Sequence, residues 1–162
     1  MSAVPTTSTV PIEDRNLWST PPDLFARLDA AANADNHRCP LWLGPGGLAE
    51  DALTVPWDLA RQPGDELPRV WCNPPYSRGM VPAFIQKAAD EARLGRARAS
   101  LLVPAWTDCP WWHELVWDPW RGRFHPGVEV EFLRGRVRFI RRDGQRGDSP
   151  TFSSMVVTFG GW

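Results

Sequence analysis

The chain has 162 residues, of which 43% are hydrophobic and 23% charged, and its length fits one domain with a real core. No apolar run is long enough to span a bilayer, and no signal peptide is evident at the N-terminus, so we expect a cytoplasmic protein without membrane contact. Three widely spaced cysteines and three histidines without ligand spacing argue against a disulfide scaffold and a metal site.

The N-terminal third alternates between patterned and irregular segments. Residues 1–15 are rich in Ser, Thr and Pro and are expected to form a flexible lead-in to one domain over residues 16–162. Capping residues, prolines and apolar residues at helical spacing predict a helix over residues 22–32. From residue 33 to 67, Asn, Gly and Pro interrupt the pattern. The residues expected to anchor this irregular stretch to the core are Trp42, Leu48, Leu53 and Trp57.

The rest of the chain alternates between strand and helix patterns. The predicted elements are strands over residues 69–72 and 99–103, a loop over 73–76, helices over 80–94 and 110–116, and strands over 128–133, 136–140 and 155–159. This order predicts an α/β fold with a mostly parallel sheet and antiparallel C-terminal strands. Such sheets bind ligands at the carboxyl ends of their strands, where the loop over residues 73–76 is expected.

That loop reads Asn73-Pro74-Pro75-Tyr76 and suits the methylation of an amino group. The side-chain carbonyl of Asn73 and the main-chain carbonyl of Pro74 can accept hydrogen bonds from a poorly nucleophilic amine, and the two prolines fix the backbone. Tyr76, the only tyrosine, offers a face to a flipped-out base or a cationic methylsulfonium. An ordinary proline turn, or a methyltransferase acting on protein glutamine, would also fit the tetrapeptide.

The distribution of charge along the chain is compatible with DNA as a partner. Residues 1–92 carry a net charge of −5 and residues 93–162 a net charge of +4, so the second part can follow phosphates, although a solvated arginine-rich surface explains the same asymmetry. The candidate phosphate contacts are the alternating Arg134, Arg136 and Arg138, which would share one face of a strand.

Tryptophans cluster at Trp106, Trp111, Trp112, Trp117 and Trp120. A stacking platform and core packing are the two interpretations, and core packing is favoured for most of them. Trp106 directly follows a predicted strand and is the best candidate to line a base pocket.

The loop is one of six motifs that follow one another from residue 17 to the C-terminus. They are Trp18-Ser19-Thr20-Pro21 with Leu24-Phe25, Asp29-Ala30-Ala31-Ala32 with Asn36 and Cys39, Asp51-Ala52-Leu53 with Trp57, Asn73 to Tyr76, Leu102 to Ala105 with Thr107-Asp108 and Trp112-His113, and Gly135-Arg136 with Phe139. In this order and rough spacing they resemble the phage DNA N-6-adenine methyltransferase (Dam) family over nearly the whole chain.

The resemblance implies a Rossmann-like, S-adenosylmethionine-dependent methyltransferase fold. It implies a phage-encoded, site-specific enzyme that transfers a methyl group to N6 of adenine in DNA. The residues that it places near the S-adenosylmethionine donor are Trp18, Thr20, Pro21, Asp29 and, as a second acidic candidate, Asp51.

One departure from the family pattern concerns the first strand. Family members usually have a short apolar strand between the Leu-Phe helix and the Asp-x-Ala-Ala segment, whereas here Leu24-Phe25 runs directly into Leu28-Asp29. We therefore expect this strand to be absent, which would place Asp29 at the end of a helix. The alternative interpretation is a catalytically impaired methyltransferase fold that binds DNA or a protein partner.

Overall fold

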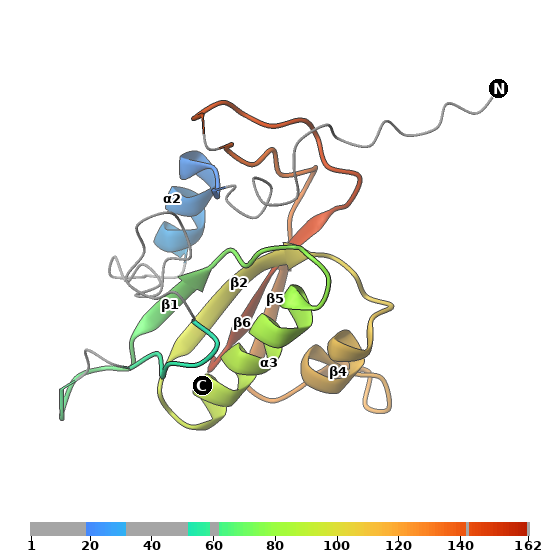
Figure 1. Cartoon of the computed structure of the whole chain (residues 1–162). Helices are drawn as coiled ribbons and strands as arrows, with labels where there is room; N and C mark the ends of the chain where they lie inside the picture. Colours follow the sequence, from blue (N-terminus) through green and yellow to red (C-terminus); the bar gives the residue numbers. More distant parts are fainter. Residues whose placement is uncertain (1–18, 32–51, 59–61, 142, 162) are drawn as a thin grey trace.

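A four-stranded sheet forms the centre of the computed structural model (Figure 1). The residues that the structure describes are 19–31, 52–58, 62–141 and 143–161. The strand order is β1 (Arg69–Cys72), β2 (Arg98–Pro104), β6 (Ser154–Phe159) and β5 (Val128–Phe132). The pair β1–β2 is parallel, and the pairs β2–β6 and β5–β6 are antiparallel. The C-terminal strands are thus antiparallel as predicted, and the sheet of the described strands is mixed.

Helices cover both faces of this sheet. Neighbouring residues of β2 point to opposite sides: Leu101 and Val103 belong to the core cluster beneath α3 (Met80–Arg93), and Leu102 belongs to the cluster beneath α2 (Pro22–Ala31). Figure 1 shows α3 in front of the strands. The result is the α/β sandwich that the sequence pattern predicts, with one hydrophobic cluster on each side of the sheet.

The helix α3 is formed and ended by local sequence signals. Its C-terminus is closed by Gly95, whose φ of +66° is accessible to glycine at little cost, and the N–H groups of Gly95 and Arg96 donate to the carbonyls of Ala92 and Glu91. The face that was predicted from helical spacing is buried, namely Val81, Phe84, Ile85 and Ala88. These contacts fix α3 directly behind the Asn-Pro-Pro-Tyr loop.

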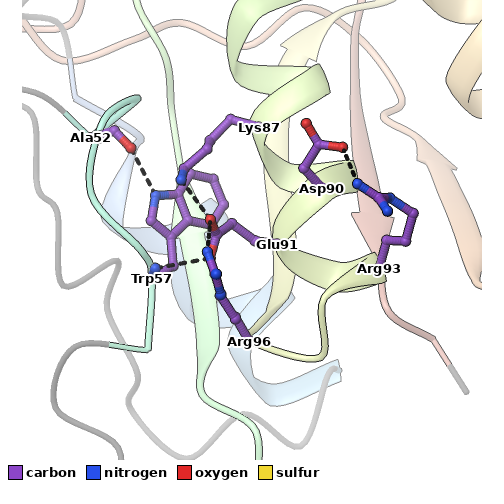
Figure 2. A network of polar contacts seen from close by, with 7 residues as sticks. All are labelled: Ala52, Trp57, Lys87, Asp90, Glu91, Arg93 and Arg96. Atoms are coloured by element: carbon purple, nitrogen blue, oxygen red, sulfur yellow. Dashed lines mark hydrogen bonds and ion pairs between the residues drawn. The ribbon is translucent and has the colours of Figure 1, made fainter.

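A buried carboxylate ties the irregular segment of residues 52–58 to α3 (Figure 2). Glu91 is only 1% exposed, and it accepts a hydrogen bond of 3.0 Å from the main-chain N–H of Trp57. Lys87 and Arg96 form ion pairs with the same carboxylate, at 2.5 and 3.5 Å. The indole N–H of Trp57 donates to the carbonyl of Ala52. Trp57 is therefore an anchor of this segment, as predicted.

Two features of the C-terminal half differ from the prediction. Residues 136–140 do not form a strand. The bridges described in this segment are isolated ones, from Ile140 to Ser19 and from Ile140 to Arg146. A short hairpin that was not predicted, β3 (Trp117–Asp118) and β4 (Arg123–Phe124), follows the π-helical turn η1 (Trp112–Val116). The predicted aromatic helix over residues 110–116 is thus present as a short π-helix over Trp112–Val116, which is wider than an α-helix.

The strand that the family pattern places after Leu24-Phe25 is absent, as expected, because α2 continues without a break to Ala31. Asp29 consequently lies within this helix. Other expectations fall outside the described residues, namely those for the lead-in over residues 1–15 and for Trp18, Trp42, Leu48 and Asp51. In the described ranges, the helices are too short or too polar to cross a membrane.

Candidate active site

The Asn-Pro-Pro-Tyr loop lies at the carboxyl end of β1, at the edge of the sheet where α/β folds bind ligands. Strand β1 ends at Cys72, and Asn73 follows it directly. Within the loop, Pro74 is buried, whereas Asn73, Pro75 and Tyr76 are half-buried. The two prolines remove backbone donors and restrict the chain, so this buried strand holds the Asn73 amide at a defined place.

Tyr76 is held firmly by its surroundings. Its hydroxyl donates a hydrogen bond of 2.7 Å to the carbonyl of Leu102 in β2. Its ring makes edge-to-face contacts with Phe139 and Phe152, at centroid distances of 5.6 and 5.7 Å. Burial raises the pKa of the phenol well above its usual value, and the nearby Cys72 contributes in the same direction. Tyr76 therefore supplies a fixed aromatic wall, and its hydroxyl remains protonated and engaged.

Trp106 is connected to this wall through Phe152. It follows β2, and its ring lies edge to face with that of Phe152 at 6.1 Å. The four rings of Trp106, Phe152, Tyr76 and Phe139 thus form a continuous series, which we call the aromatic row. Trp106 is thus connected to Tyr76 of the loop through Phe152, and its role in lining a base pocket stays a prediction.

Phe152 was not singled out from the sequence. It could have been identified from its position shortly before the predicted strand over residues 155–159. An antiparallel pairing of this strand with β2 brings the residue before it to the carboxyl end of β2, where Trp106 lies.

The N-terminal motif reaches the same edge. The main-chain N–H and C=O of Ser19 exchange hydrogen bonds of 2.8 and 2.9 Å with those of Ile140. The hydroxyl of Thr20 accepts a weaker bond of 3.4 Å from the indole N–H of Trp71 in β1. Pro21 is buried next to it. Thr20 and Pro21 are therefore fixed beside the strand that carries the Asn-Pro-Pro-Tyr loop.

The three candidate phosphate contacts lie in the irregular segment that follows β5. Arg134, Arg136 and Arg138 are exposed, and Phe139 at the end of this segment is buried against Tyr76. The guanidinium groups of Arg136 and Arg138 donate to main-chain carbonyls at 2.7 and 3.0 Å. Buried Val137 and Phe139 thus alternate with exposed Arg136 and Arg138 without a strand. Arg134 lies in a bend that precedes them, so a face shared by all three arginines stays a prediction.

The acidic candidates are not brought to the site by the described contacts. Asp29 lies in α2, and its side chain is outside the described part of the structure, as is the whole of Asp51. Across the described ranges, His, Cys, Asp and Glu side chains form no group of three that could hold a metal ion. The described site is therefore built from one amide, main-chain carbonyls, aromatic rings and arginines.

An α/β sandwich with an Asn-Pro-Pro-Tyr loop at the carboxyl end of a buried strand fits the class of amino-directed methyltransferases. The family model for DNA N-6-adenine-methyltransferase (Dam) matches residues 7–162. The chain belongs to this family, as the order of its motifs predicts. No curated protein and no solved structure matches the chain.

Proposed function

We propose that this protein transfers the methyl group of S-adenosylmethionine to N6 of adenine in DNA at specific sites. The observation that carries the proposal is the meeting of three distant motifs at the carboxyl end of β1. Thr20 contacts Trp71 of this strand, Asn73 directly follows it, and Phe139 packs against Tyr76. A loop with hydrogen-bond acceptors is thereby combined with an aromatic wall and a basic segment.

The loop supplies what a weakly nucleophilic amine needs. The side-chain oxygen of Asn73 and the main-chain carbonyl of Pro74 would accept hydrogen bonds from the N6 amino group and stabilise the positive charge that develops on its nitrogen. The aromatic row would hold the base flat beside them, since aromatic faces stack on any base. A base in duplex DNA would have to be flipped out of the helix to enter this site.

The donor would lie on the side of the loop where the N-terminal motif is fixed. S-adenosylmethionine supplies, when bound, an electrophilic methyl group on a positively charged sulfur. The residues proposed to hold it are Thr20 and Pro21 beside β1, together with Trp18, Asp29 and Asp51. The described part of this group offers a hydroxyl and a buried ring, which fit the donor, and the proposed carboxylates would add acceptors for its hydroxyl or amino groups.

DNA is favoured over protein glutamine as the methyl acceptor because of the exposed side of the basic segment. The side chains of Arg134, Arg136 and Arg138 are exposed, and the segment continues into Phe139, which contacts Tyr76 of the loop. Phosphates next to a flipped adenine would therefore meet guanidinium groups, which bind them through paired hydrogen bonds.

The test is the transfer of labelled methyl groups from S-adenosylmethionine to unmethylated DNA, followed by digestion and identification of the modified nucleoside. We expect N6-methyladenine from the native protein, a loss of roughly a hundredfold or more for Asn73→Ala, and native activity for Gln86→Ala. Gln86 is a matched control because it is an exposed amide on α3. Absence of transfer by folded native protein at saturating donor would refute the proposal.

The missing first strand favours a second candidate, a methyltransferase fold that binds DNA without catalysing transfer. In the described chain, β1 is the first strand in sequence order, and its parallel neighbour is β2. Calorimetric titration with S-adenosylmethionine separates the two functions. Donor binding together with transfer supports the enzyme, whereas DNA binding without donor binding supports the second candidate.

A further inference from the structure

The tryptophan cluster divides into buried rings and one ring that the fold leaves in solvent. Trp111 and Trp112 are each 5% exposed and belong to the core, whereas Trp120 is 95% exposed. It lies in the turn between β3 and β4, which Figure 1 shows beside α3. This ring buries almost none of its apolar surface within the fold, so its faces are available for stacking.

The turn that carries Trp120 is well ordered by Asp118. One carboxylate oxygen of Asp118 accepts the main-chain N–H groups of Trp120 and Arg121, at 3.0 and 3.1 Å, and the other accepts the Arg121 guanidinium at 2.8 Å. These bonds, with that of the Arg121 side chain the strongest influence, lower the pKa of Asp118. Gly122, with φ of +60°, completes the turn. Trp120 is thus presented by a fixed backbone.

The surroundings of Trp120 suit a nucleotide. An open hollow of about 630 Å³ lies against it, lined also by His113, Glu114 and His125. This volume falls in the range of roughly 300–1,000 Å³ that is usual for small-molecule sites. Glu114 can accept a hydrogen bond from an exocyclic amino group of a base, while it would repel a phosphate. Arg123, which is exposed on the β4 side of the turn, offers a positive charge for the phosphate.

We propose that the β3–β4 turn is a second DNA contact, separate from the catalytic loop, in which Trp120 stacks on an unpaired nucleobase. Arg123 then faces the adjoining phosphate, and Glu114 faces the edge of the base. The inference rests on the proposed function for its choice of DNA, and it adds to that function a site that holds a strand without contacting the reacting amine.

The experiment measures binding of the full chain to a fluorescein-labelled 20-nucleotide single strand, and to its duplex, by anisotropy. Stacking on one base accounts for about a 5- to 100-fold difference in affinity, so we expect a loss of that order for Trp120→Ala on the single strand. Trp120→Phe should recover most of this loss. Leu94→Ala is the matched control, since Leu94 is an exposed apolar residue at the end of α3, and it should bind as the native protein does.

The test of the second DNA contact can be distinguished from the test of methyl transfer. Asn73→Ala should bind the single strand normally while losing methyl transfer, whereas Trp120→Ala should lose binding and keep its transfer rate at saturating DNA. If the native protein transfers no methyl groups but binds the single strand more tightly than Trp120→Ala does, the second contact is supported and the catalytic proposal is refuted. Equal binding of the single strand by native protein and Trp120→Ala would overturn the inference. A change only in self-association, measured by light scattering, would also overturn it.

Discussion

Tyr76 and Phe139 lie edge to face with ring centroids 5.6 Å apart, so the Asn-Pro-Pro-Tyr loop and the Gly-Arg-x-x-Phe motif are in direct contact. This contact links a residue next to β1 with a residue of the basic segment. The position of Tyr76 therefore depends in part on a segment that is distant from the loop in the sequence.

A double-mutant cycle measures this contact. We expect Tyr76→Leu and Phe139→Leu to show a coupling free energy of about 0.5–1.5 kcal/mol in urea unfolding, the usual range for an aromatic pair. Phe139→Leu should also lower the methyl-transfer rate, because the wall of the base pocket loosens. Phe124→Leu is the control, since Phe124 packs on Trp117 outside the site, and it should change stability while preserving activity. Strict additivity of the two site variants would contradict the prediction.

Tyr76→Phe tests the hydroxyl alone. The variant removes the bond to the Leu102 carbonyl, and we expect a loss of about 0.5–1.5 kcal/mol in the free energy of unfolding. Because the ring stays in place, methyl transfer should remain close to the native rate.

The same substitution predicts a pH dependence. Burial raises the pKa of the Tyr76 phenol in the folded protein, so the folded state retains this proton at pH values where the unfolded state has lost it. The corresponding stability is complete below about pH 10, the unfolded-state value, and is lost as the pH rises toward the folded-state pKa. Urea unfolding at increasing alkaline pH should therefore show the native protein losing its advantage over Tyr76→Phe. Tyrosinate absorbance reports this one group, since the chain has a single tyrosine.

Glu91→Gln tests the buried carboxylate shown in Figure 2. Loss of its charge weakens the interactions with Lys87 and Arg96, and we expect a decrease of about 1–3 kcal/mol in the free energy of unfolding. Asp90→Asn is the control on the neighbouring position of α3. Its pair with Arg93 is on the surface, so its loss should cost about 0.5 kcal/mol or less. Similar effects of both substitutions would show that burial of Glu91 adds nothing.

Arg134→Gln tests the basic segment. If this side chain contacts one phosphate, the slope of the logarithm of DNA affinity against the logarithm of salt concentration should decrease by about 0.9 for duplex DNA. Arg93→Gln, which changes an exposed arginine at the end of α3, should leave the slope unchanged. An unchanged slope for Arg134→Gln would remove Arg134 from the DNA interface.

The elements that the sequence predicted correctly are those in which local pattern and tertiary packing agree. The apolar run of β1, the helical spacing of α3 and the apolar alternation of β6 each identify an element that is buried in the core. The loop over residues 73–76 was also identifiable, because its prolines cannot continue a central strand.

The errors arose where alternation or composition had more than one physical cause. Val137 and Phe139 are buried between exposed arginines, so residues 136–140 look like a strand, yet this alternation comes from packing against Tyr76 and its neighbours rather than from a ladder. The strands β3 and β4 are two residues long and too short for any periodicity. Core packing was favoured for most of the tryptophans, which Trp111 and Trp112 confirm, but composition did not indicate that Trp120 would be the exposed one.

The pairing of Ser19 with Ile140 has a consequence for biosynthesis. The two halves of the site come from opposite ends of the described sequence, and closing so long a loop requires both to be present. A ribosome releases the N-terminal motif and the Asn-Pro-Pro-Tyr loop well before the segment that contains Phe139 and Phe152. The nascent chain therefore carries Asn73 and Tyr76 without the rings that pack against Tyr76, and the arrangement at the end of β1 forms only after Phe139 and Phe152 have been synthesised and have folded onto it.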